Sequence, residues 1–111
     1  MARPFRIEFE DAIYHITARG NRRERIFASD ADRQRFVETL VRSLARYQVE
    51  LHAYVLLPNH FHLLARTKRP NLSRWMHWLM VTYTVFFNRR HGKVGHLFQG
   101  RYKSLLVEGG N

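Results

Sequence analysis

Four short stretches of β-branched and aromatic residues predict β-strands in this chain. They lie at residues 12–18, 50–57, 60–67 and 101–107. Pro58 and Asn59 separate the second stretch from the third, and proline cannot donate a hydrogen bond to a strand ladder. The second and third strands are therefore expected to form a hairpin around this turn.

Two longer segments carry apolar residues at spacings of three and four, which is typical of helices with one buried face. The first helix is predicted over residues 30–47, with Ser29 as its N-cap residue. The second is predicted from Asn71, which can cap it, to about Arg90, because Gly92 is a usual residue just past a helix end.

The predicted order of elements is β-α-β-β-α-β. This order indicates an α+β protein of the ferredoxin-like plan, with an antiparallel sheet and two helices on one face. No repeat, linker or low-complexity segment interrupts the pattern, so residues 1–111 are expected to form a single domain. Many activities share this plan, and the fold alone assigns none of them.

The charge balance narrows the choice of partner. Nineteen Lys and Arg residues face nine Asp and Glu residues, which gives a net charge of +10. Arginine greatly outnumbers lysine, and its planar guanidinium group matches phosphate oxygens in pairs. A nucleic acid is the expected partner, and the alternative is a generally basic protein without one.

Cysteine usage and hydropathy exclude other classes. The chain has no cysteine, so disulfides, thiolate metal sites and a cysteine nucleophile are excluded. No apolar run approaches the roughly 20 residues that span a bilayer. We therefore expect a cytoplasmic protein without a membrane partner.

Basic residues gather in two segments that we expect to contact DNA. The candidates of the first turn are Arg19, Arg22, Arg23 and Arg25. The candidates around the last strand are Lys93, Arg101, Tyr102 and Lys103, where the tyrosine could stack on a base. The alternative for each charged residue is an ordinary solvated surface.

The sharpest local motif is His60-Phe61-His62. Residues i and i+2 of a strand point to the same face, so both imidazoles should project together while Phe61 points into the core. Neutral imidazole is a general ligand for divalent metals, so the pair could share one cation. Alternatively, one histidine caps a turn and the other is solvated. No other histidine has a spacing that adds it to the pair, although His52 could neighbour it across the hairpin.

The motif stands in a longer stretch, residues 57–64 (LPNHFHLL), that resembles the His-hydrophobic-His (HUH) signature of the single-tyrosine transposases. The closest group is the REP-associated tyrosine transposases. Four further stretches are similar to that group and occur in the same order. They are residues 14–23 (YHITARGNRR), 51–56 (LHAYVL), 87–92 (FNRRHG) and 95–104 (GHLFQGRYKS).

The resemblance implies a fold and a chemistry. The family has the same β-α-β-β-α-β plan, and its two histidines, here His60 and His62, hold Mg²⁺ or Mn²⁺ at a phosphate of single-stranded or hairpin DNA. A tyrosine then attacks the phosphorus and forms a 5′-phosphotyrosine link. In the family this tyrosine lies in a helix after the last strand, which here would fall beyond Asn111.

The sequence therefore predicts a transposase domain that is truncated at its C-terminal end and inactive by itself. None of its five tyrosines matches the family's position, and Tyr83 lies on the apolar stripe of the second helix. Loss of the last helix could expose apolar sheet surface and favour a homodimer.

Two alternatives come from other classes. One is a non-catalytic nucleic-acid-binding module, although such sheets usually carry aromatic residues on the open face. The other is a metal-dependent phosphoesterase that uses water, for which Glu50 and Glu108 are the nearest carboxylates by strand order.

Overall fold

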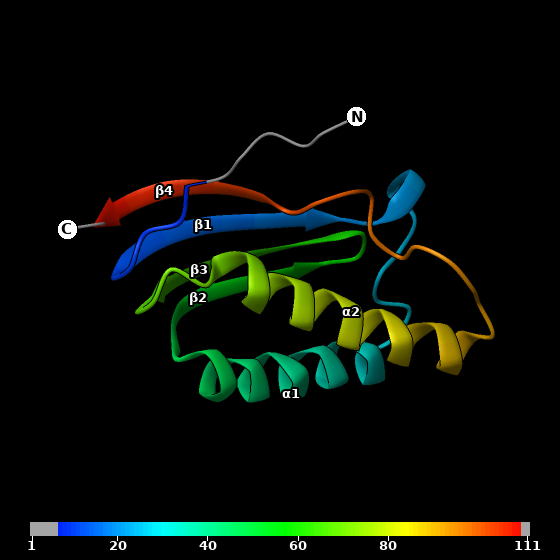
Figure 1. Cartoon of the computed structure of the whole chain (residues 1–111). Coiled ribbons are helices and arrows are strands. Elements are labelled where there is room, and N and C mark those ends of the chain that lie inside the picture. Colours follow the sequence, from blue (N-terminus) through cyan, green and yellow to red (C-terminus); the bar gives the residue numbers. More distant parts are fainter. Residues whose placement is uncertain (1–6, 110–111) are drawn as a thin grey trace.

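The computed structural model describes residues 7–109 of the chain. Four antiparallel strands form one sheet in the order β2-β3-β1-β4, and both helices cover the same face of it (Figure 1). The elements are β1 (Ala12–Arg19), η1 (Asn21–Arg23), α1 (Asp30–Tyr47), β2 (Val49–Leu57), β3 (His60–Thr67), α2 (Leu72–His91) and β4 (Lys103–Gly109). The predicted fold class and order of elements are confirmed.

The helix boundaries follow the predicted ones closely, but the caps differ. Ser29 occupies the N-cap position of α1 without a side-chain capping bond, and Asp32 instead accepts a hydrogen bond from the Ala28 amide at 2.8 Å. Asn71 uses its side-chain amide to donate to the Tyr47 carbonyl. Gly92 ends α2 with a φ of 62°, a left-handed conformation that suits glycine.

The last strand departs most from its predicted limits. It begins at Lys103, two residues later than expected, because Tyr102 turns into the protein interior. The Tyr102 ring is only 6% exposed, and its hydroxyl lies 3.1 Å from Ser73 Oγ on α2. The expectation that Tyr102 could stack on a base is therefore wrong for this structure, since its ring does not lie on the surface.

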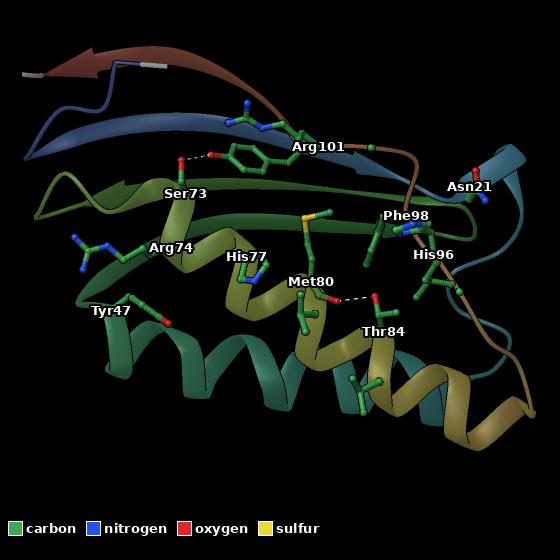
Figure 2. A pocket seen from close by; sticks show the side chains of 16 residues that line it. Asn21, Tyr47, Ser73, Arg74, His77, Met80, Thr84, His96, Phe98 and Arg101 are labelled. Carbon is green, nitrogen blue, oxygen red and sulfur yellow. Dashed lines mark hydrogen bonds between the residues drawn. The ribbon is translucent and has the colours of Figure 1, made fainter. Parts of the chain in front are cut away.

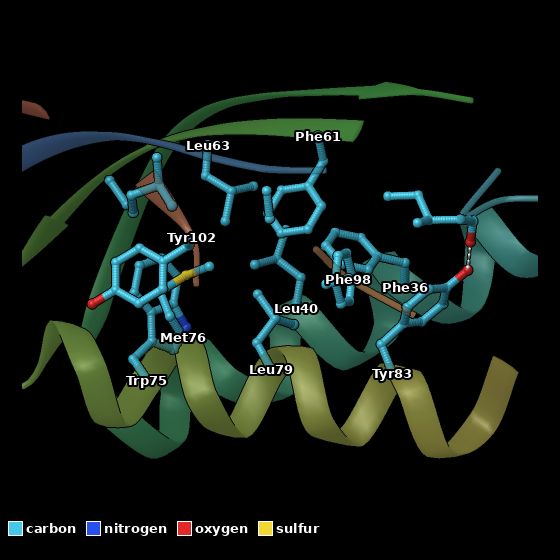
Figure 3. Close-up of a cluster of buried hydrophobic side chains, with 14 of the residues drawn as sticks. Phe36, Leu40, Phe61, Leu63, Trp75, Met76, Leu79, Tyr83, Phe98 and Tyr102 are labelled. Carbon is cyan, nitrogen blue, oxygen red and sulfur yellow. Dashed lines mark hydrogen bonds between the residues drawn. The ribbon is translucent and has the colours of Figure 1, made fainter. Parts of the chain in front are cut away.

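The core lies between the helices and the covered face of the sheet (Figure 3). Every second residue of β1 and β3 points into it, and Phe61 is completely buried. The Phe61 ring packs against Phe36 of α1, which in turn meets Tyr83 of α2 edge to face. Because of this alternation, the remaining residues of β1 and β3 face the open side of the sheet.

Tyr83 joins the core to the loop after β1. Its ring is fully buried, as its spacing predicted, and its hydroxyl donates to the Ile26 carbonyl at 2.5 Å. Burial raises the pKa of the Tyr83 hydroxyl, so the group stays neutral and remains a hydrogen-bond donor. The loop that carries the first basic cluster is thus fixed to α2.

A buried carboxylate connects the N-terminal end of α1 to the C-terminal end of α2. The Asp32 side chain is completely buried at the start of α1 and contacts two residues at the end of α2. His91 Nε2 lies 2.9 Å from one carboxylate oxygen, and Arg90 Nε lies 3.3 Å from the other. The basic end of α2 therefore has a structural role.

Candidate metal and DNA-binding site

His60 and His62 project together from β3 on the open face of the sheet. Both are half-buried, and their ring centroids lie 5.0 Å apart. Phe61 between them points into the core, so the predicted alternation of this motif is confirmed. The strand thus presents two imidazoles side by side without disturbing the packing beneath them.

The strand register defines what surrounds the pair. Arg19 on β1 lies opposite His60, and Thr17 lies opposite His62. Lys103 on β4 lies opposite Thr17 in turn. Residues directly opposite on antiparallel strands share a face, so Arg19 and Lys103 stand on the same face as the histidines.

His15 is a third histidine in this cluster, which the sequence analysis had set aside. Its Nε2 lies 3.0 Å from Nδ1 of His62, and the two rings lie nearly parallel with an interplanar angle of 21°. Spacing along the chain gave no indication of this contact between His15 and His62. The two residues are 47 positions apart and become neighbours only through the pairing of β1 with β3.

Both histidines of the motif have Nδ1 engaged in hydrogen bonds. His60 Nδ1 lies 2.8 Å from Asn59 Oδ1. His62 Nδ1 lies 3.0 Å from His15 Nε2 and 3.2 Å from Thr17 Oγ1. Within residues 7–109 neither Nε2 atom has a hydrogen-bond partner. Metal-binding histidines usually use one ring nitrogen in this way and coordinate through the other.

The electrostatics favour the neutral form of His62. Partial burial lowers the pKa of this imidazole below its usual 6.5, and the nearby charges of His60 and His15 lower it further. A neutral ring keeps the lone pair that a metal needs.

Among the residues that the structure describes, no group of three or more His, Cys, Asp or Glu side chains converges to hold a metal ion. His60 and His62 are therefore the candidate donors on this face, and the remaining positions around a cation held by them would fall to phosphate and water oxygens.

The carboxylates lie at the other end of the sheet. Glu50 pairs with Arg66, four residues further along β3 than His62, and Glu108 Oε2 lies 3.7 Å from Arg66 Nη2. At about 3.3 Å per residue, Arg66 lies about 13 Å from His62 along the strand. His52 lies at a register shift in β2, between the residues that pair with Ala65 and Leu64, and its Nε2 atom lies 2.7 Å from Glu50 Oε1. His52 therefore contacts Glu50 and not His60 or His62, so the expectation that it could neighbour the histidine pair is wrong.

The first basic segment lies at the histidine end of the sheet. The Gly20 amide donates to the Asn59 carbonyl at 2.8 Å, and the Asn21 amide donates to the Leu97 carbonyl at 2.8 Å. The Gln99 amide donates back to the Arg19 carbonyl, also at 2.8 Å. Three segments distant in sequence therefore meet beside His60: the loop after β1, the β2–β3 turn and the loop before β4.

The backbone of this first segment is unusual. Arg22 and Arg23 both have positive φ values, 56° and 59°, which arginine rarely adopts. Gly20 is required just before them, because a Cβ atom there would lie 2.1 Å from the Glu24 carbonyl oxygen. Strained backbone of this kind is often found at functional sites, and here it presents exposed arginines next to the histidine face.

The second basic segment divides between the two sides of the sheet. Lys103 stands on the open face, whereas Arg101 lines a groove of about 940 Å³ on the helix side (Figure 2). The groove also holds Arg74 and His77 of α2 and His96 of the preceding loop. The predicted DNA candidates therefore do not form one patch, and the groove does not include the histidine pair.

No tyrosine of residues 7–109 stands on the open face with His60 and His62. On β1 and β2, Tyr14 and Tyr54 pair with the core-facing residues Ala65 and Leu63. The other three lie on the helix side of the sheet. They are Tyr47, Tyr83 and Tyr102.

The fold and the site together define a basic ferredoxin-like domain with a histidine pair on an open sheet. The sequence profile described as "Transposase IS200 like" matches residues 8–111, nearly the whole chain. The protein belongs to this family of IS200-like transposases. No curated protein matches the chain.

Two solved structures have the same fold. One is a REP-associated tyrosine transposase bound to a REP hairpin, with a TM-score of 0.75 and 17% identity, covering 98% of this chain. The chain spans only 64% of that protein's length. The other is a putative transposase from Deinococcus radiodurans R1, with a TM-score of 0.71 and 17% identity, covering 96% of this chain and 87% of that one. No helix among residues 7–109 is long and apolar enough to cross a membrane.

Proposed function

We propose that this chain is the DNA-binding and metal-binding part of a transposase that acts on single-stranded or hairpin DNA. His60 and His62 would hold Mg²⁺ or Mn²⁺ through their Nε2 atoms, and the cation would supply positive charge for a DNA phosphate at the open face of the sheet. The observation that carries this proposal is that both Nδ1 atoms are hydrogen-bonded, whereas neither Nε2 atom has a partner among residues 7–109.

The surroundings of the pair support a phosphate ligand. Arg19 and Lys103 stand on the same face, and the exposed Arg22 and Arg23 lie in the adjoining loop. A bound divalent cation would neutralise charge on the phosphate oxygens and orient the scissile bond. Imidazole is a softer ligand than Mg²⁺ prefers, so we expect Mn²⁺ to bind more tightly. The solved relative bound to a REP hairpin supports DNA as the partner.

The two alternative functions have less support. A nucleic-acid-binding sheet of the RNA-binding type would place aromatic rings on its open face. Here the open positions of β1 are Ile13, His15, Thr17 and Arg19, and those of β3 are similarly free of Phe, Tyr and Trp. A phosphoesterase that activates water would need a general base, and the carboxylates Glu50 and Glu108 lie at the far end of the sheet.

Strand cleavage through a phosphotyrosine also needs a nucleophile at the metal. Since no tyrosine of residues 7–109 stands on the open face, we propose that the 111-residue chain binds its DNA without cleaving it. Incubation with a labelled hairpin and Mn²⁺, followed by denaturing electrophoresis, tests this point. A covalent protein–DNA adduct would contradict it.

Calorimetry tests the metal site directly. Mn²⁺ and Mg²⁺ are titrated into the chain with and without a single-stranded hairpin, and the wild type is compared with the double variant His60→Ala/His62→Ala. The matched control is His77→Ala/His96→Ala, which removes two exposed histidines of the helix-side groove. We expect the first variant alone to lose metal binding, and we expect the metal to bind more tightly when DNA is present.

The opposite result has a clear meaning. If the double variant binds metal and DNA as tightly as the wild type, the histidine pair is structural. The non-catalytic nucleic-acid-binding module then becomes the better account of the chain.

A further inference from the structure

His15 has a defined relation to His62 that the proposed function does not use. Its partner directly opposite on β3 is Leu64, so His15 and His62 are diagonal neighbours across the β1–β3 pair. Diagonal neighbours on one sheet face lie within reach of aromatic-sized side chains. Here the contact is polar, with Nε2 of His15 3.0 Å from Nδ1 of His62.

We propose that His15 is a positioning residue, which orients the His62 ring and fixes its tautomer by accepting a hydrogen bond from Nδ1. The inference rests on the proposed function, because it gives His15 a task only if His62 coordinates a cation. With Nδ1 protonated, His62 keeps its lone pair on Nε2, the nitrogen without a hydrogen-bond partner in the described part of the chain.

The tautomer follows from the donor and acceptor roles of the two rings. A neutral imidazole has one N–H donor and one acceptor nitrogen. If His62 donates from Nδ1, then His15 accepts at Nε2 and carries its own proton on Nδ1. The reverse arrangement would place the His62 proton on Nε2 and close that atom to a metal.

His60 makes the equivalent contact with a different acceptor. Its Nδ1 lies 2.8 Å from the side-chain oxygen of Asn59, which can only accept, so His60 also keeps its lone pair on Nε2. The two histidines thus have matched tautomers, one fixed by an amide oxygen and the other by an imidazole. A carboxylate or a carbonyl usually serves as such an acceptor. The carboxylates Glu50 and Glu108 lie too far along the sheet to replace His15.

Thr17 is a second contact of His62 Nδ1, at 3.2 Å. A hydroxyl can either donate or accept, so Thr17 alone does not decide which nitrogen of His62 carries the proton. His15 Nε2 can likewise donate or accept, but it lies closer to His62 Nδ1 than the Thr17 hydroxyl does. In the proposal His15 is therefore the main acceptor, and Thr17 is a weaker alternative acceptor.

Three variants separate the loss of the hydrogen-bond acceptor at position 15 from the loss of side-chain volume there. His15→Leu removes the acceptor and keeps an apolar side chain of similar reach. His15→Gln restores an acceptor oxygen at a distance from the backbone close to that of Nε2. His77→Leu is the matched control, since it removes an exposed histidine of α2 on the other side of the sheet.

The first measurement uses the metal-free protein. Long-range ¹H–¹⁵N NMR spectra of the imidazole rings report which nitrogen of His62 carries the proton. We expect the Nδ1–H tautomer in the wild type, in His15→Gln and in His77→Leu, and a shift toward Nε2–H in His15→Leu. A His62 ring protonated on Nε2 in the wild type, or a tautomer that His15→Leu leaves unchanged, would overturn the proposal.

The second measurement is Mn²⁺ affinity by calorimetry. Loss of an outer partner of a metal-binding histidine typically lowers affinity by about 10–100-fold, so we expect a loss of this size in His15→Leu and recovery in His15→Gln. Pulsed electron paramagnetic resonance then counts the imidazoles bound to Mn²⁺. Two would agree with the proposal, and three would make His15 a ligand and not a positioning residue.

The two proposals can fail separately. If His60→Ala/His62→Ala still binds Mn²⁺ with wild-type affinity, the metal site is wrong, whatever the NMR spectra of the His15 variants report. If that double variant loses Mn²⁺ binding while His15→Leu keeps both its tautomer and its affinity, the metal site stands and the role of His15 is wrong.

Discussion

The two faces of strands β1 and β3 perform different tasks with alternate residues of the same segments. On the covered face, Ile16, Phe61 and Leu63 are completely buried under the helices. On the open face, one residue away along each strand, stand His15, Thr17, His60 and His62 in contact with one another. Neighbouring residues of one strand therefore belong to different networks.

This division has a physical consequence. Core packing fixes the backbone of β3, so the two imidazoles are held at their mutual distance without using any binding energy. A polar cluster on the open face can then change without loss of buried apolar area. We expect substitutions on the covered face to act on stability and those on the open face to act on binding.

The largest expected effect breaks the covered face. Phe61→Ala removes a fully buried ring that packs on Phe36 and Phe98, and such truncations cost about 3–5 kcal/mol. Urea denaturation monitored by circular dichroism measures this loss. His62→Ala, one position away, is the matched control and should change the free energy of unfolding by less than about 1 kcal/mol. Equal losses in the two variants would show that the faces are not separable.

A second, smaller effect tests how far the core controls the basic loop after β1. Tyr83→Phe removes one hydroxyl and leaves the buried Ile26 carbonyl without its donor, which costs about 1–3 kcal/mol. Because Ile26 follows directly after Arg25, we also expect faster amide hydrogen exchange in residues 20–28. Thr84→Val is a control on α2, since the Thr84 hydroxyl donates to the Met80 carbonyl of its own helix. Unchanged exchange in Tyr83→Phe would mean that the other contacts fix the loop by themselves.

A third effect compares the two sides of the sheet in DNA binding. Lys103 stands on the open face and Arg101 lines the helix-side groove, although the two are only two residues apart. If single-stranded DNA lies over the histidines, Lys103→Ala removes one phosphate contact and lowers the salt dependence of log K by about 0.7. Arg101→Ala should leave it nearly unchanged. Fluorescence anisotropy over a range of salt concentrations measures both slopes, and the reverse result would place the DNA on the helix side.

Local patterns in the sequence were sufficient for the fold. Strand and helix periodicities predicted α1 within its observed limits and β3 from His60 to Thr67. The last strand was misplaced by two residues because the sequence around Tyr102 alternates like a strand, whereas its hydroxyl bonds to Ser73 of α2. A tertiary contact of this kind has no local signature.

Only the part of the candidate site that lies on a single strand could be predicted from the sequence. The face shared by His60 and His62 follows from a spacing of two residues. The position of His15 depends on which strands pair and in which register, and neither is determined by a local pattern. The expected order of strands in a ferredoxin-like sheet places the first beside the third, so a test of open-face residues on both strands could have found His15.

The smallest expected effect distinguishes the two ends of the open face. Glu50 accepts a hydrogen bond from His52 at 2.7 Å, which lowers the pKa of the carboxyl below its usual 4.5, and Lys68 and Arg66 add to the shift. A lowered pKa contributes stability that is fully present above pH 4.5 and is lost as the pH falls through the folded-state value. Glu50→Gln should therefore melt slightly below the wild type near neutral pH, and the difference should vanish in acid.

Glu38→Gln on α1 is the control, because Glu38 makes no ion pair among residues 7–109. Mn²⁺ affinity should not change in either variant, since Glu50 lies far from His62, and a loss of affinity in Glu50→Gln would mean that the two ends of the open face are coupled.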